Sequence, residues 1–332
     1  MTRSHNVLLL ALALLTSSCG GGTAATAGTE TVAAPAPARD VWEGDLTGAF
    51  PATTDMVVRI NGQSLRSWRG WAQVAPMIEN AIATNGSPDR LETRVFRAMF
   101  TDAREFAGGF HVGAGRGDEQ GIGIATLSTA ANIFANHATS DAFGYQVMSE
   151  GGSAVALLDS STIVLCGTDA ASTELQRLKS GDFANVWTND QMRTLRDSLN
   201  GDHATATLIY APAPAVREEA ARDAARELQL DTATAAALAS MQAVSVRVDA
   251  AESIQASVFI DVDSDEHAAL LSSRAQALVR GYASNLAIQI AGLSPILNHI
   301  VITSSGRRVT VQLTISPTET DALISRLQMI AG

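Results

Sequence analysis

The clearest pattern along the chain is a strict alternation of apolar and polar residues in its C-terminal half. Three segments show it: AVSVRVD (243–249), SIQASVFIDVD (253–263) and RVTVQLTIS (308–316). Successive side chains of a strand point to opposite faces of a sheet, so each segment has one buried face and one wet face. Antiparallel sheets that are covered on a single side produce this pattern. We therefore predict such a sheet here, with helices as its cover.

A long helix is predicted between Ser264 and Gly292. Apolar residues recur there at helical spacing, at Leu271, Ala275, Leu278, Tyr282 and Leu286. A helix with this pattern has an apolar stripe that packs on the sheet. If the fit between helix and sheet is loose, the stripe borders an apolar cavity. The candidate lining of that cavity is Leu271, Leu278, Tyr282 and Leu286.

Both halves of the chain follow the same order of predicted elements. In the first half these are a strand at 55–60, helices at 64–83 and 88–106, a hairpin at 110–127, a helix at 129–138, strands at 153–158 and 162–166, and a helix at 170–178. In the second half they are a strand at 203–210, two helices, a hairpin at 243–263, the long helix, strands at 299–303 and 308–315, and a helix at 318–329.

One offset of 149 residues aligns the two halves at both ends, placing Val58 on Thr207 and Cys166 on Ile315. We predict an α+β fold made of a degenerate tandem repeat of two β-α-α-β-β-α-β-β-α halves, residues 46–200 and 201–332. Each half is expected to be an antiparallel sheet backed by helices on one face. Identity between the halves is low, so the alternative is a chance similarity of two ordinary α+β domains.

The N-terminus has the features of an export signal. Arg3 precedes an unbroken apolar run from Val7 to Leu15, and small residues then lead to Cys19. The run is too short for a ~30 Å hydrocarbon layer, which takes ~20 residues. A positive start, a short apolar core and a small-residue exit are typical of a secretory signal peptide. We assign residues 1–18 to this signal and residues 19–45, rich in Gly, Ala, Thr and Pro, to a flexible tether.

The segment ending in Cys19 resembles the lipobox of bacterial lipoproteins. The resemblance covers residues 1–20 and implies cleavage before Cys19, which then carries lipid. Thr16 stands where that family usually has Leu, which is a departure. Gly20 in place of Asp implies an outer-membrane address, facing either the periplasm or the cell surface. The implied partner is a membrane, reached through the lipid.

Composition narrows the classes of partner. The chain of 332 residues is 46% hydrophobic and has a formal net charge of −11. This acidity argues against nucleic acid, because such binding depends on neutralising phosphates with Lys and Arg. It also disfavours electrostatic attachment to anionic lipid. If Cys19 is lipidated, Cys166 is the one thiol left, so no intramolecular disulfide is expected.

The glycine-rich stretch GFHVGAGRGDEQGIGIA (109–125) suggests a phosphate-binding loop. A dinucleotide loop needs a further glycine where Asp118 stands, and a helix after it. A strand is predicted there instead, so we interpret the stretch as a hairpin turn with glycines at positive φ. The tripeptide Arg116-Gly117-Asp118 is weak evidence of cell attachment for a motif so short.

Other candidate chemistry has a structural interpretation. The stretch Asp261–His267 lacks the Gly and Glu of a calcium loop, because Glu266 and Ser272 stand at those positions. Cys166 is expected to be a small buried hydrophobe. The histidines have no metal-ligand spacing. Trp68 and Trp71 are expected to share a helix face, in the core or as an aromatic anchor for a partner.

The sequence thus predicts no catalytic residue, metal or cofactor. Function must be argued from a site, and the sequence favours a non-enzymatic binding or structural role as a cell-envelope lipoprotein with an envelope partner. The alternative is a carrier of a lipid or another apolar ligand. An enzyme is the least favoured of the three.

Overall fold

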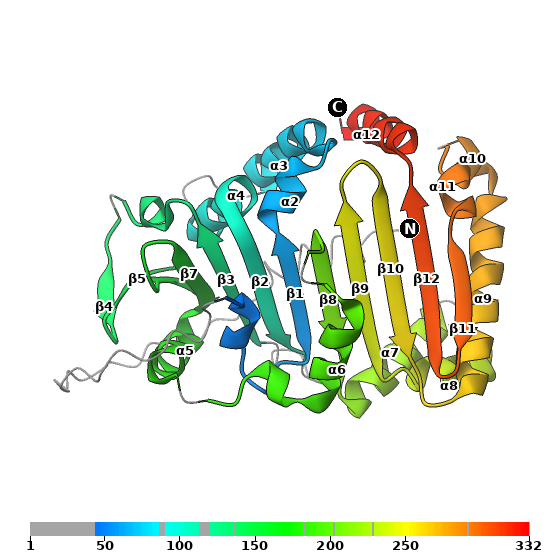
Figure 1. Cartoon of the computed structure of the whole chain (residues 1–332), viewed down its shortest axis with the longest axis horizontal. Coiled ribbons are helices and arrows are strands. Elements are labelled where there is room, and N and C mark those ends of the chain that lie inside the picture. The colour runs from blue at the N-terminus through cyan, green and yellow to red at the C-terminus, as the bar shows by residue number, and fades with distance from the viewer. Residues whose placement is uncertain are drawn as a thin grey trace.

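A computed structural model describes residues 44–85, 90–112, 120–135, 137–181, 183–201, 203–227, 229–290 and 292–331. Within these ranges a single 12-stranded sheet has the order β11-β12-β10-β9-β8-β1-β2-β3-β7-β6-β5-β4 (Figure 1). All neighbouring strands pair antiparallel. The strands are β1 (Met56–Asn61), β2 (Ala103–His111), β3 (Gln120–Leu127), β4 (Ser140–Ala142), β5 (Tyr145–Glu150), β6 (Ser153–Leu157), β7 (Thr162–Gly167), β8 (Ala206–Tyr210), β9 (Ala243–Ala250), β10 (Ile254–Asp261), β11 (Val301–Ser305) and β12 (Arg308–Ile315).

Helices connect and cover these strands. They are α2 (Gly62–Ser67), α3 (Trp71–Asn85), α4 (Leu91–Asp102), α5 (Thr168–Ser180), α6 (Asp190–Leu199), α7 (Pro214–Glu227), α8 (Thr232–Ala239), α9 (Asp265–Ala283), α10 (Leu286–Ile290), α11 (Ser294–Asn298) and α12 (Pro317–Ala331), with 3-10 turns η1 (Leu46–Ala49), η2 (Ala130–Ile133) and η3 (Val186–Thr188). The α+β class and the antiparallel sheet are as predicted.

The alternating strands pair in the register that their pattern requires. Val246 lies opposite Val258, and Val258 lies opposite Val311. Directly paired residues share a face, so the apolar positions of β9, β10 and β12 form one surface. We call the face with these valines the α9 face, because α9 packs on it. The opposite face, which carries Val57 and Ile209, is called the α6 face.

The strand order is the same in both halves. Outward from the centre it is β1-β2-β3-β7-β6 on one side and β8-β9-β10-β12-β11 on the other, and β1 pairs antiparallel with β8. Two halves in this order are related by a two-fold axis normal to the sheet. This rotation reverses the direction of each strand but leaves its side chains on the same face of the sheet. Descent of the halves from one duplicated unit stays a prediction.

The offset of 149 residues is wrong by an odd number of positions. It places Ile60 on Ile209 and Val164 on Leu313. Ile209 and Val164 pack in the core on the α6 face, whereas Ile60 and Leu313 belong to the α9 face. A shift of one residue moves a strand's side chains to the other face. An even offset is therefore needed to match the halves.

Helices cover both faces of the first half, and not one face as predicted. Phe106 packs in a cluster with Val95 and Met99 of α4, whereas its neighbour Ala107 packs in a cluster with Leu175 of α5. Consecutive strand residues point to opposite sides, so these clusters lie on opposite faces. The strands β2, β3 and β7 are apolar on both faces, and this doubly covered sheet gives no clean alternation.

Four elements differ from the predicted order. The strands β4 and β5 and the helix α6 were not predicted, and the helix expected at 129–138 is the short turn η2. The signal for α6 is present in the sequence. Asn189 accepts hydrogen bonds from the N–H groups of Gln191 and Met192, and Met192, Leu195 and Leu199 are buried at helical spacing.

Candidate functional site

The long helix α9 begins where the sequence predicts. The hydroxyl of Ser264 accepts a hydrogen bond from the N–H of His267, and Asp265 and Glu266 occupy the first turn. Ser264 thus caps the start of the helix, and the negative charges of Asp265 and Glu266 interact favourably with the helix dipole there. Beyond this turn, Ala268 and Leu271 are buried against β11 and β12, in a cluster with Ile302 and Val309.

The apolar stripe of α9 is buried at one end of the helix and exposed at the other. Leu278 and Tyr282 follow Leu271 at positions that lie within about 20° of it around the helix axis. Leu271 is 9% exposed, whereas Leu278 is 52% and Tyr282 is 56% exposed. Leu286, at the start of α10, is 69% exposed. The stripe therefore continues from the core onto the surface.

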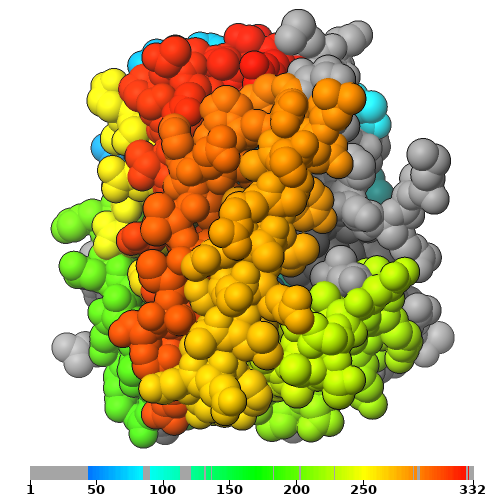
Figure 2. Space-filling view, turned by 90° about the vertical axis from the view of Figure 1, so that its right-hand side faces the viewer, coloured from blue at the N-terminus to red at the C-terminus, as the bar shows by residue number. Residues whose placement is uncertain are grey.

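The length of α8 explains this change. In Figure 2, α7 and α8 (yellow-green) lie beside the N-terminal part of α9 (gold), and the C-terminal end of α9 (orange) lies above them. Ala237 of α8 belongs to the cluster of Leu271, and Arg274 pairs with Asp231 at the start of α8. Past this point the described residues leave the stripe open. We call Leu278, Tyr282 and Leu286 the apolar stripe surface.

The predicted cavity lining thus divides into two environments. Leu271 packs in the core, and the other three residues form an exposed surface, so the four do not enclose a cavity as a group. The α9 face of the sheet also carries half-buried valines, among them Val246 and Val258.

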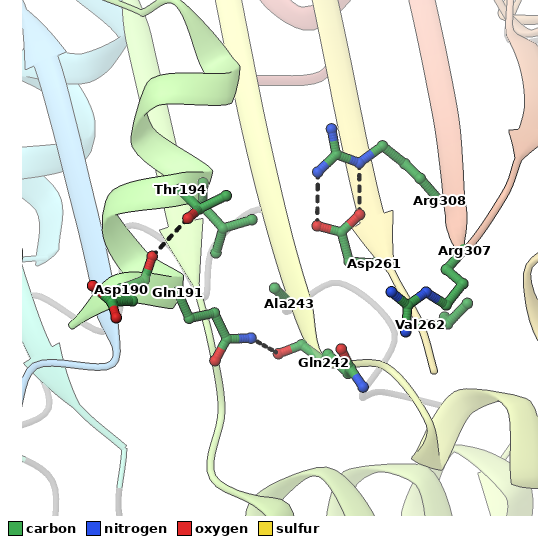
Figure 3. A pocket seen from close by; sticks show the side chains of 10 residues that line it. Asp190, Gln191, Thr194, Gln242, Ala243, Asp261, Val262, Arg307 and Arg308 are labelled. Atoms are coloured by element: carbon green, nitrogen blue, oxygen red, sulfur yellow. Dashed lines mark hydrogen bonds and ion pairs between the residues drawn. The ribbon is translucent and has the colours of Figure 1, made fainter. Parts of the chain in front are cut away.

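A depression of about 440 Å³ lies on the α6 face, between α6 and the turn that joins β11 to β12 (Figure 3). Its polar lining is largely engaged within the protein. Arg308 donates to Asp261 at 2.6 and 2.8 Å, and Gln191 donates to the carbonyl oxygen of Gln242 at 3.2 Å. Sequence reasoning missed this site, because its lining comes from four separate segments.

A second depression, of about 280 Å³, lies on the same face where β1 meets β8. Arg59 pairs with Glu105 at 2.6 Å, and the guanidinium of Arg196 lies 4.5 Å from the ring centroid of Trp187. The indole N–H of Trp187 donates to the hydroxyl of Thr47 at 3.0 Å. These contacts join η1, which contains Thr47, to α6 and to the centre of the sheet.

Asp55, Cys166 and Tyr210, whose pKa values burial raises, lie outside the lining of the two depressions. Burial raises the pKa of the Cys166 thiol to about 12, so this buried residue is protonated at neutral pH and is no nucleophile, consistent with the predicted core role. Burial also raises the pKa of Asp55, although the N–H of Val112 and His111 oppose the shift. Burial, with Asp55 nearby, raises the pKa of Tyr210 to about 12. Asp55 holds the end of β2 in place.

The acidic stretch after β10 forms ion pairs and a helix cap. Asp261 pairs with Arg308, and Asp263 lies 2.6 Å from the ring of His267. Across the described ranges, no group of three or more His, Cys, Asp or Glu side chains is arranged to hold a metal ion. Ser264 caps the following helix, as the structural interpretation of Asp261–His267 expects.

Other predicted features have different outcomes. Cys19 and the tripeptide Arg116-Gly117-Asp118 lie outside the described residues. The glycine-rich stretch joins the antiparallel strands β2 and β3, as the hairpin interpretation predicts. Trp68 and Trp71 do not share a helix, because α2 ends before Trp68 and α3 begins at Trp71.

Comparison with known proteins gives a similarity of structure alone. No family model and no curated protein matches the chain. Crystal form I of TP0453 is similar with a TM-score of 0.46 and 11% identity, over 86% of this chain and 96% of that chain. Crystal form III has a TM-score of 0.48 and 12% identity, over 85% and 97%. No inference about ligand or activity follows from this similarity. In the described part of the chain, no helix has the length and apolar character to cross a bilayer.

Proposed function

We propose that this chain is a non-enzymatic binding protein of the bacterial cell envelope, anchored by lipid at Cys19, and that its ligand is apolar. The observation that carries the apolar ligand is the exposed stripe of Leu278, Tyr282 and Leu286 on α9 and α10. The envelope location is supported by the N-terminal sequence, with its short apolar run and the small residues before Cys19.

The three exposed side chains favour ligand binding as a group. Isolated apolar residues are normal on a protein surface, but aligned ones that form a patch mark binding sites. Covering a large apolar side chain completely is worth about 1.5–3 kcal/mol. A ligand that covers Leu278, Tyr282 and Leu286 therefore gains several kcal/mol before its own entropy cost. This is enough for a weak or moderate complex.

The chemistry of the ligand follows from the same surface. The three side chains offer one phenolic hydroxyl and no charge. An acyl chain matches this surface, because it needs no hydrogen-bond partner. The second candidate is an apolar segment of an envelope protein, which the same side chains favour in the same way.

The test uses residues 20–332, which contain every residue that the structure describes. A fluorescent fatty acid is titrated into this protein and into the double variant Leu278→Ser, Tyr282→Ser. We expect the variant to lose at least tenfold in affinity, because two apolar contacts of this size are removed. The control is Phe143→Ser, which removes an apolar side chain that is 42% exposed on the turn between β4 and β5.

Three outcomes separate the candidates. Binding that the double variant weakens and the control does not supports the acyl-chain ligand. If the protein does not bind the fatty acid but crosslinks to an envelope protein through Tyr282, the ligand is a protein segment. Equal fatty-acid affinity in all three proteins contradicts the role of the apolar stripe surface.

A further inference from the structure

We propose that the depression between α6 and the β11–β12 turn binds a small carboxylate that carries a short apolar group, and that Arg307 is the residue that holds the carboxylate. This site lies on the α6 face, away from the apolar stripe surface, and is independent of the proposed function. The inference rests on the fixed rim, the uncompensated charge and the apolar floor of the depression.

The rim that carries Arg307 is fixed by contacts with the end of β10. The N–H of Val262 donates to the carbonyl oxygen of Arg307 at 2.9 Å. The next residue, Arg308, forms a two-point ion pair with Asp261, and its guanidinium lies 5.6 Å from the ring centroid of Phe259. The turn is therefore held before a ligand arrives, which lowers the cost of binding.

Two lining side chains remain available for a ligand. The hydroxyl of Thr194 donates to the carbonyl oxygen of Asp190 at 2.8 Å, and the amide of Gln191 donates to the backbone of Gln242. Among the described residues, the side chains of Arg307 and Gln242 have no such partner. Figure 3 shows both at the edge of the same depression. A guanidinium and a carboxamide together supply donors for one carboxylate.

The charge of the lining also favours a single negative group. Asp261 is paired with Arg308, and Asp190 is paired with Arg193 on the next turn of α6. The charge of Arg307 is the one in this lining that no described residue compensates. A monoanion therefore balances the site, although the chain as a whole has a net charge of −11.

The floor of the depression determines which group the ligand carries besides its carboxylate. Leu195 and Ala243, which belong to the core on the α6 face, line it and are 3% and 2% exposed. A short aliphatic group fits against them, while a long chain extends beyond the floor. The volume of about 440 Å³ lies within the range of small-molecule sites, ~300–1,000 Å³.

The experiment uses N-acetyl-leucine as the probe and N-acetyl-leucinamide as its uncharged match. Each is titrated into the full chain, purified in nonionic detergent, and binding is followed by calorimetry and by saturation-transfer NMR. We expect the acid to bind at least tenfold more tightly than the amide, because a charge-assisted hydrogen bond to Arg307 is lost in the amide. Arg307→Gln is expected to remove this preference.

The matched control is Arg280→Gln, which neutralises an exposed arginine on α9. This variant should bind N-acetyl-leucine as the parent does. The proposal is overturned if the acid does not bind at about 10 mM, if acid and amide bind equally, or if Arg307→Gln leaves the preference intact. Fatty-acid binding by Arg307→Gln should equal that of the parent, so failure here is distinguishable from failure of the apolar ligand.

Discussion

Several glycines of the 109–125 stretch have a role in packing. Gly109, Gly121 and Gly123 lie within β2 and β3, and none of them has positive φ. A Cβ at Gly109 would lie 2.5 Å from the ring of Phe50, and one at Gly121 would lie 2.9 Å from the ring of Phe110. The absent side chains thus make room for aromatic rings.

This role could be predicted from the sequence only in part. The flanking strands were visible, and the hairpin between them followed from their pattern. The contact of Gly109 with Phe50 could not be predicted, because Phe50 lies at the end of η1, which is distant from Gly109 in sequence. Turn glycines and packing glycines look alike until the fold brings their neighbours together.

The packing role predicts a difference between two glycines. Gly109→Ala should lower the free energy of unfolding by about 1–3 kcal/mol, the usual cost of overpacking a core. Gly123→Ala should have a much smaller effect, because its Cβ would meet Leu165 at 3.6 Å, an ordinary contact. Urea denaturation of both variants measures the difference. A loss for Gly109→Ala as small as that for Gly123→Ala would contradict this role, because it would show that Phe50 moves aside at no cost.

At the scale of the element, α9 shows what helical spacing can and cannot predict. Its start followed from the sequence, but α9 ends at Ala283 and Leu286 belongs to α10. Leu271 and Leu278 are equivalent in the predicted pattern. The structure separates them, because α8 begins beside Arg274 and covers Leu271 but not Leu278. The extent of this cover is a tertiary property, because the spacing of apolar residues along α9 does not show which part of α9 lies against α8.

The different environments along α9 predict different stabilities. Leu271→Ala should lower the free energy of unfolding by about 2–4 kcal/mol, because it leaves a cavity beside Ile302 and Val309. Leu278→Ala should change it by no more than about 0.5 kcal/mol, as is usual at exposed positions. Thermal and urea denaturation check both values. A large loss at Leu278 would mean that this side chain is covered in the folded protein, contrary to its 52% exposure.

At the scale of the molecule, the two halves form one sheet. The strands β1 and β8 pair from Met56–Tyr210 to Ile60–Ala206. The core on the α6 face also crosses the boundary, because Ile209 and Ala243 pack with Val57 and Leu178. Arg69 reaches Asp321 of α12 at 2.7 Å, next to α3 (Figure 1). Most elements of each half were predictable, but the joining of β1 to β8 was not, because two strand edges far apart in sequence carry no mutual signal.

This shared sheet predicts that the second half is not stable alone. A fragment of residues 201–332 exposes the edge of β8 and loses the core partners of Ile209. Such an edge promotes association with other chains. We expect no cooperative unfolding transition for the fragment by circular dichroism, in contrast to residues 20–332. A cooperative transition in the monomeric fragment would show that the halves are independent domains.

The central claim is that this protein binds an apolar molecule, and the most direct measurement is its mass as purified. Residues 20–332, secreted by an exporting host, are weighed under native and denaturing conditions, and the protein is extracted with organic solvent. The account predicts a native mass that exceeds the denatured mass by an acyl-chain-containing molecule, near one per chain, and a smaller excess in Leu278→Ser, Tyr282→Ser. Equal native and denatured masses, with an extract free of lipid, would contradict it.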